Sequence, residues 1–168
     1  MTEDENRVLI LGIGNILMGD EGIGSHVAQY LSRNDLLNGI ECIDGGTGGF
    51  YLLECIQDAS VVVMIDAAND GHKTGTISCI SPRYSADYPN SLTAHDIGLK
   101  DMIDAVYLLG KIPHIRLFAV SIIPPTLPSL ELTPEIENLI PEIADMVLKE
   151  ANQHSSSVWL SQKISGED

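Results

Sequence analysis

Residues 8–24, VLILGIGNILMGDEGIG, contain the clearest structural signal of this sequence. This stretch opens with four large aliphatic residues, and Gly12 then ends the run. A short, continuous apolar run closed by glycine is typical of a β-strand that is buried on both faces. Beyond it, apolar side chains recur at Ile23, Val27, Tyr30 and Leu31. This spacing predicts a helix with one buried stripe, so the stretch as a whole predicts a strand followed by a helix.

The rest of the chain repeats this alternation. Further strands are predicted at 40–43, 61–65, 76–80 and 115–122, and further helices at 48–57, near 99–106, and from Thr133 and Pro134 onward, where Pro141 should introduce a kink. Only about ten residues separate the strand at 61–65 from the strand at 76–80. A parallel crossover needs a dozen or more, so we expect the latter strand to run antiparallel. The predicted fold is an α/β domain with a mixed sheet and helices on both of its faces.

Composition narrows the class of protein. The chain has 168 residues, and 24 Asp and Glu against 9 Lys and Arg give a net charge of −15. We expect a single domain over 1–168, with polar ends before residue 8 and a flexible tail at 155–168.

So acidic a chain repels phosphate backbones and anionic lipids, which argues against nucleic acid or membrane partners. The sequence has no long apolar run, and Cys42, Cys55 and Cys79 have no paired spacing. Because Asp and Glu occur among the first six residues, we expect no signal peptide. These features predict a cytoplasmic protein, which we expect to be a monomer.

Three candidate site residues stand at turns just beyond predicted strands: Glu21, Asp66 and His95. Two carboxylates and an imidazole suit a borderline divalent transition metal and leave coordination positions open. In an α/β sheet, ligands bind beyond the carboxyl ends of the strands, where the winding direction switches. If the strand order begins 2-1-3, the strands that lead to Glu21 and Asp66 are neighbours about 4.8 Å apart. The metal hypothesis therefore favours that order.

Each of these residues also has a purely structural interpretation. Asp20 and Glu21 would suit the positive end of a helix dipole, Asp66 could hydrogen-bond within its own turn, and His95 could be a polar cap. Asp44, in the run DGGTGG at 44–49, is either a turn residue or a catalytic acid.

A nucleotide-binding module is the main alternative from another functional class. Gly12 and Gly14 after a first strand, with Asp44 after a second, imitate a dinucleotide-binding unit. The imitation fails at its third glycine position, which is Leu17, and Asp20 and Glu21 would compete with a pyrophosphate at the helix N-terminus. The sequence also lacks the G-x-S-x-G and H-E-x-x-H signatures of common hydrolases. An ordinary hydrolase with a resident metal stays open as a further alternative.

Five short motifs carry a family resemblance: GIGNILMGDEGIG at 12–24, DGGT at 44–47, IDA at 65–67, HDIGL at 95–99 and LTP at 132–134. With them, the chain closely resembles the nickel–iron hydrogenase maturation endopeptidases over about residues 7–150. The resemblance implies a three-layer α/β/α sandwich around a five-stranded sheet of order 2-1-3-5-4 with strand 4 antiparallel. The metal-contacting residues of that family correspond to Glu21, Asp66 and His95, with no departure. Ala94 stands where some relatives have proline, which changes the stiffness of the loop and not the ligand.

The resemblance also implies an activity. Such a protease removes the C-terminal extension of a hydrogenase large-subunit precursor once nickel has been inserted. Glu21, Asp66 and His95 would contact the nickel that the precursor carries, so weak or no resident metal binding is expected in the protease itself. Two ways of cutting remain open. The metal could polarise the scissile carbonyl or activate a water, or a carboxylate such as Asp44 or Asp66 could act as the base while nickel serves only for recognition.

Overall fold

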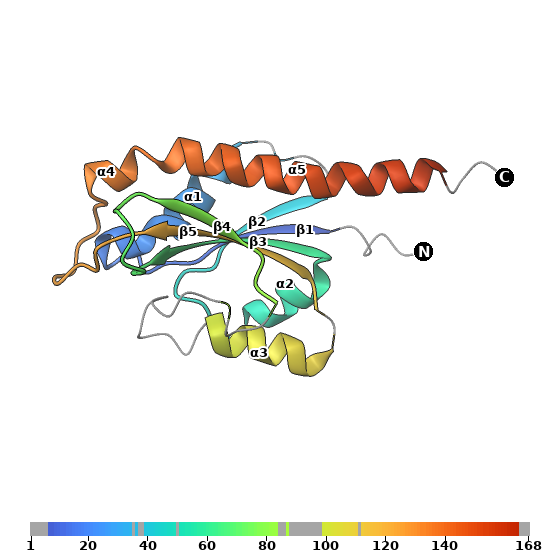
Figure 1. The fold of residues 1–168 in the computed structure, drawn as a ribbon, viewed down its shortest axis with the longest axis horizontal. Helices are drawn as coiled ribbons and strands as arrows, with labels where there is room; N and C mark the ends of the chain where they lie inside the picture. Colours follow the sequence, from blue (N-terminus) through green and yellow to red (C-terminus); the bar gives the residue numbers. More distant parts are fainter. Residues whose placement is uncertain are drawn as a thin grey trace.

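A computed structural model describes residues 7–34, 36, 39–49, 51–83, 87, 99–110 and 112–164. Strands and helices alternate along the chain in this order (Figure 1): β1 Val8–Gly12, the 3-10 helix η2 Gly19–Gly22, α1 Ile23–Leu31, β2 Ile40–Asp44, α2 Leu52–Asp58, β3 Val61–Ala68, β4 Ile77–Ile80, α3 Leu99–Leu109, β5 His114–Ser121, α4 Pro134–Glu137 and α5 Ile140–Ile164. Over the described residues, no helix is both long and apolar enough to cross a membrane.

The sheet has the order β2-β1-β3-β5-β4. β1 pairs in parallel with β2 and β3, β3 pairs in parallel with β5, and β4 runs antiparallel to β5. The expected fold class, a mixed five-stranded sheet with an antiparallel fourth strand, is therefore confirmed. β4 runs antiparallel because the link at 69–76 is too short to carry the chain back to the start of a parallel strand.

Helices cover both faces of the sheet, with α1 and α5 on one side and α2 and α3 on the other (Figure 1). Side chains along β3 alternate between the two cores, as the pleat of a strand requires. Val63, Ile65 and Ala67 join the core of α1 and α5, whereas Val62, Met64 and Ala68 join the core of α2 and α3. This alternation decides which layer each acidic residue of the sheet faces.

Several boundaries differ from the sequence prediction. β3 continues to Ala68, because Asp66, Ala67 and Ala68 go on pairing with β5, so Asp66 lies inside a strand and not in a turn. Tyr30, which was expected on the buried stripe of α1, is 40% exposed. The predicted helix with a kink at Pro141 is two helices, and Pro141 lies in the first turn of α5, where its missing N–H removes no helical bond. α5 then continues to Ile164, through most of the segment predicted to be a flexible tail.

Candidate active site at the carboxyl ends of the strands

Glycines bring the β1–α1 loop and α1 unusually close to the strand ends. A Cβ added at Gly24 would lie 2.0 Å from the carbonyl oxygen of Ile13 and 2.3 Å from that of Ile65. A Cβ at Gly12 would lie 2.1 Å from the carbonyl oxygen of Gly24. No real side chain tolerates these distances. The glycines therefore do more than form a turn, because they allow α1 and the strand ends to approach each other through their backbones. The N–H of Ile13 donates to the carbonyl oxygen of Ile65 over 2.8 Å, which ties the loop to β3 one residue before Asp66.

Glu21 lies in η2, the 3-10 turn that directly precedes α1. Its side chain is half-buried, and η2 contacts β3. The loop is closed by its own backbone, since the N–H of Glu21 donates to Met18 and its carbonyl oxygen accepts from Asn15. The segment that carries Glu21 is thus packed against the strand that carries Asp66, as the 2-1-3 strand order predicts.

Asp66 is 1% exposed and lies opposite Ala119 in the β3–β5 ladder. Its Oδ1 accepts a hydrogen bond of 2.7 Å from the N–H of Ala67. Because side chains alternate along β3, Asp66 shares a face with Met64 and Ala68, on the side of α2 and α3. α3, whose Ile103 packs into that same core, begins at Leu99, four residues after His95.

His95 itself lies outside the described residues. Among the residues that the structure does describe, no three His, Cys, Asp or Glu side chains gather closely enough to hold a metal. Since that search omits His95, the predicted set of Glu21, Asp66 and His95 stays a prediction.

Asp44 ends β2 and lies directly opposite Gly12 of β1. Its Oδ2 accepts a 2.8 Å hydrogen bond from Nε2 of Gln29, and its Oδ1 accepts one of 3.0 Å from the N–H of Gly46. Burial alone would raise the pKa of the carboxyl, but hydrogen bonds from Gln29, Ser25 and Gly46 outweigh burial and lower the pKa of Asp44 below its usual value. Because Gln29 belongs to α1, Asp44 faces the layer opposite to that of Asp66. The two aspartates therefore lie on opposite faces of the sheet, on strands β2 and β3, which β1 separates.

Asp20, which the sequence predicts only as an acid suited to a helix dipole, joins two distant segments of the chain. Asp20 is only 7% exposed, and its Oδ1 accepts a 2.7 Å hydrogen bond from the N–H of Thr133. Oγ1 of Thr133 donates to Oδ2 of the same carboxylate over 2.9 Å. Thr133 is the N-cap residue of α4, as predicted, but its hydroxyl makes no capping bond and instead binds Asp20. The only sequence signal was Asp20 beside Glu21, which gives no hint of a partner 113 residues away.

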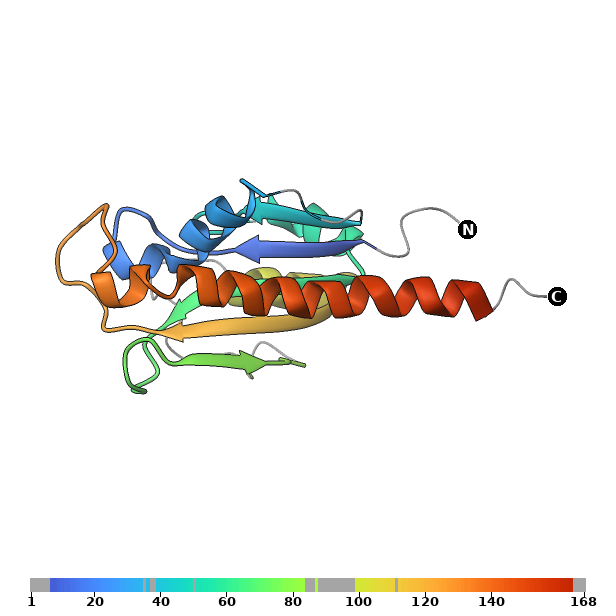
Figure 2. The same cartoon turned by 90° about the horizontal axis from the view of Figure 1, so that it is seen from above.

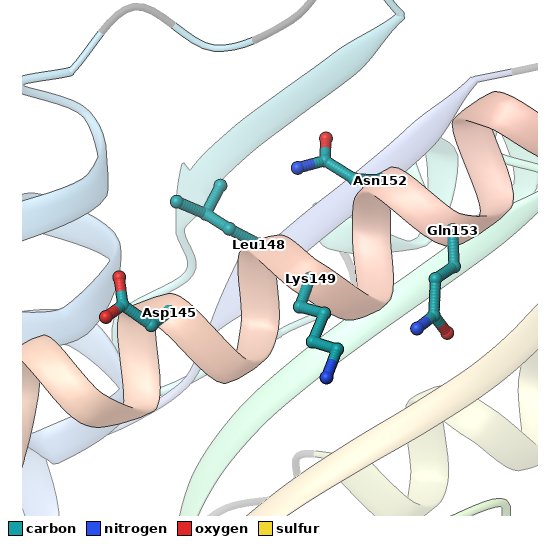
Figure 3. Close-up of a pocket in the computed structure, with 5 residues that line it drawn as sticks. All are labelled: Asp145, Leu148, Lys149, Asn152 and Gln153. Carbon is teal, nitrogen blue, oxygen red and sulfur yellow. The ribbon is translucent and has the colours of Figure 1, made fainter.

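Described residues line two hollows of comparable size. One, of about 480 Å³, lies beside η2 between Gly19, Thr74 and the segment at 123–135, and is therefore next to the candidate site. The other, of about 590 Å³, lies along α5, where Leu148 and Asn152 point to one side and Lys149 and Gln153 to the other (Figure 3). All the described residues that line the larger hollow belong to α5, and none of them belongs to a loop at the carboxyl ends of the strands, where ligands of α/β sheets bind.

Comparison with known proteins identifies the family. The family model described as hydrogenase maturation protease matches residues 25–150. The chain is 33% identical over 146 residues to the hydrogenase 2 maturation protease of Escherichia coli K12, which covers 84% of this chain and 88% of that protein. Among solved structures, the E. coli hydrogenase maturating endopeptidase HybD superposes with a TM-score of 0.76 at 32% identity, covering 88% of this chain and 93% of that one.

A second solved structure leads to the same family. The [NiFe] hydrogenase maturation protease HybD of Thermococcus kodakarensis has a TM-score of 0.71 at 25% identity, covering 86% of this chain and 99% of that chain. Fold, sequence and family model thus point to the same group of enzymes. The chain belongs to the hydrogenase maturation protease family of endopeptidases.

Proposed function

We propose that this endopeptidase removes the C-terminal extension of a nickel-loaded [NiFe]-hydrogenase large-subunit precursor in the cytoplasm. Glu21, Asp66 and His95 would contact the nickel that the precursor carries. The observation that carries this proposal is the packing of η2, with Glu21, against β3, with Asp66, at the carboxyl end of the sheet. The names of the E. coli and Thermococcus relatives support the hydrogenase as the substrate.

The donor set suits a metal that arrives with the substrate. Carboxylate oxygen and imidazole nitrogen are ligands that divalent nickel accepts, and a set of three without sulfur leaves positions for thiolates from the precursor. Binding of the metal then draws on ligands from both proteins, so it is strongest when the precursor already holds nickel. Recognition of the metal and recognition of the substrate become one event.

The cut itself adds water across one peptide bond. The water oxygen bonds to the carbonyl carbon, the C–N bond breaks, and a proton is delivered to the departing amine. We infer that the reacting bond lies on the side of the sheet that Asp66 faces. Asp44 is less suited to be the base, because its lowered pKa weakens it as a proton acceptor and its two oxygens are already held by Gln29 and Gly46.

The decisive experiment compares four mixtures: precursor with or without nickel, and protease with or without prior treatment by a chelator that is then removed. We expect cleavage only with nickel-bearing precursor, and full activity of the chelator-treated protease. Equal cleavage of the nickel-free precursor would show that the protease does not recognise the metal. Loss of activity after chelation of the protease alone would point to a hydrolase with a resident metal.

A thermal-shift measurement separates this proposal from a nucleotide-binding module. η2 carries Asp20 and Glu21 and ends at Gly22, the N-cap of α1, where a pyrophosphate would have to bind. We therefore expect no stabilisation by NAD or NADP. Divalent nickel, zinc or cadmium should stabilise the fold by up to about 2.7 kcal/mol when present at 100 times its dissociation constant.

A further inference from the structure

Beside the candidate site, two loops expose large apolar side chains to solvent. Leu17 precedes η2, and Ile123, Leu127 and Leu130 lie in the loop between β5 and α4; each of the four is between 58% and 75% exposed. We call these four residues the apolar rim. The β5–α4 loop extends beyond the end at which β1, β3 and β5 terminate, on the same side as η2 (Figure 2). Exposed apolar side chains grouped at one end of a sheet are typical of an interaction surface.

Backbone hydrogen bonds hold the two loops of the rim together. The N–H of Ser129 donates to the carbonyl oxygen of Leu17 over 3.0 Å, and the N–H of Gly19 donates to the carbonyl oxygen of Ser129 over 2.7 Å. The two hydrogen bonds from Thr133 to Asp20 close the same junction a few residues further on. A surface that is ordered before its partner arrives loses little conformational entropy on binding.

The hollow of about 480 Å³ opens within these loops. Ile123 and the prolines that follow it form part of its wall, and Asp20, Glu131 and Glu135 contribute three carboxylates. None of the described residues that line it is Lys, Arg or His. The wall therefore combines apolar surface with net negative charge, which complements a side chain that has an aliphatic stem and a cationic head.

We propose that the apolar rim and the adjoining hollow dock an extended segment of the hydrogenase precursor, with apolar side chains on the rim and one Lys or Arg side chain in the hollow. This inference rests on the proposed function, because it names how that substrate is held. The volume of the hollow suits one or two side chains and not a folded domain. A second copy of this chain is a poor occupant, because two molecules of charge −15 repel each other.

The first test measures the apolar rim with a purified nickel-loaded precursor. The double variant Leu127→Ser and Leu130→Ser should weaken binding of the precursor and raise KM about tenfold or more, with kcat unchanged. Leu108→Ser is the matched control, because Leu108 is 88% exposed near the end of α3, toward the opposite, amino end of the strands. All these side chains are exposed, so the variants should unfold at the same temperature as the wild type.

The second test measures the charge of the hollow. The double variant Glu131→Gln and Glu135→Gln should raise KM severalfold at low salt, and its KM should respond less to added salt than that of the wild type. If wild type cleaves the precursor and both double variants bind and cleave it equally well, the docking surface is wrong and the proposed function stands. If wild type neither binds nor cleaves nickel-loaded precursor, the proposed function is wrong and this inference falls with it.

Discussion

The carboxylates at the two ends of the sheet have different kinds of partners. At the carboxyl ends of the strands, Asp20 accepts hydrogen bonds from Thr133, and Asp44 accepts them from Gln29 and Gly46. All of these donors are neutral. Near the amino end of β5, Glu150 instead forms an ion pair with Arg116, whose Nε lies 2.8 Å from Oε1 without the angle of a hydrogen bond.

The donors that surround these carboxylates suit the two ends of the sheet to different roles. Neutral donors orient a carboxylate without cancelling its charge, so the negative potential persists and can attract an arriving cation. A cationic partner cancels the charge and joins two elements, here α5 to β5. Asp70, in the loop after β3, differs from the other carboxylates at this end, since His72 Nδ1 lies 2.9 Å from its Oδ2. A site for a substrate-borne metal is therefore expected at the carboxyl end and not at the amino end.

Substitutions at the candidate site should change activity more than substitutions at the amino end of the sheet. Glu21→Gln, Asp66→Asn and His95→Ala should each lower cleavage of nickel-loaded precursor by at least about 100-fold while the protein stays folded. The amide side chain in the Asp66→Asn variant still offers an oxygen to the N–H of Ala67, so the buried hydrogen bond is kept. Glu150→Gln, at the other end, is the control and should cleave normally. Near-normal cleavage by any two of the three site variants would refute a shared site.

The second prediction concerns the stability of the two ends. Gly24→Ala should destabilise the fold by about 3 kcal/mol or more, because its Cβ would collide with the carbonyl oxygens of Ile13 and Ile65. Gly110→Ala, beyond α3 at the amino end, meets open space and has only the strain of φ +83°, so about 1–2 kcal/mol is expected. Denaturant unfolding measures both values. Equal destabilisation would show that the β1–α1 loop is not packed as closely as described.

The third prediction tests the anchor between η2 and α4. Thr133→Val removes the hydroxyl that donates to Asp20 and should destabilise the fold by about 1–3 kcal/mol, since the buried carboxylate loses a partner. Asp20→Asn should have a similar effect. The double variant should be less destabilised than the sum of the two single variants, because both remove the same interaction. Additive effects in denaturant unfolding would mean that the two residues act independently.

The smallest expected effect is a pH dependence at the amino end. Burial lowers the pKa of His114 below its usual 6.5, and the neighbouring His154 and Arg116 lower it further, although Glu150 acts in the opposite direction. The unfolded chain then binds the proton more tightly, so this histidine's contribution to stability is complete above pH 6.5 and declines as the pH falls below it. His114→Gln should make the unfolding free energy less dependent on pH between about 7 and 5. An unchanged slope would contradict this assignment.

Local patterns predicted much of this architecture. The apolar run at 8–11 corresponds to β1, and the stripe that includes Ile23 and Val27 corresponds to α1. The short link at 69–76 correctly predicted that β4 pairs antiparallel. The prediction for Asp66 was right about the end of the sheet and wrong about the turn, because pairing with β5 extends β3 past the apolar run. Tyr30 was wrongly assigned to the core, because periodicity counts an amphipathic side chain as apolar although its hydroxyl can remain in water.

The sequence alone predicts the alternation of elements, the direction of β4 and the acidic character of the chain, because periodicity, link length and charge are local properties. The folded structure was needed to establish that Asp44 and Asp66 face opposite layers and that Asp20 binds Thr133 across 113 residues. It also shows that Gly24 packs against the carbonyl oxygens of Ile13 and Ile65. These features depend on contacts between segments far apart in the chain, and no local pattern encodes the distance or the direction between such segments.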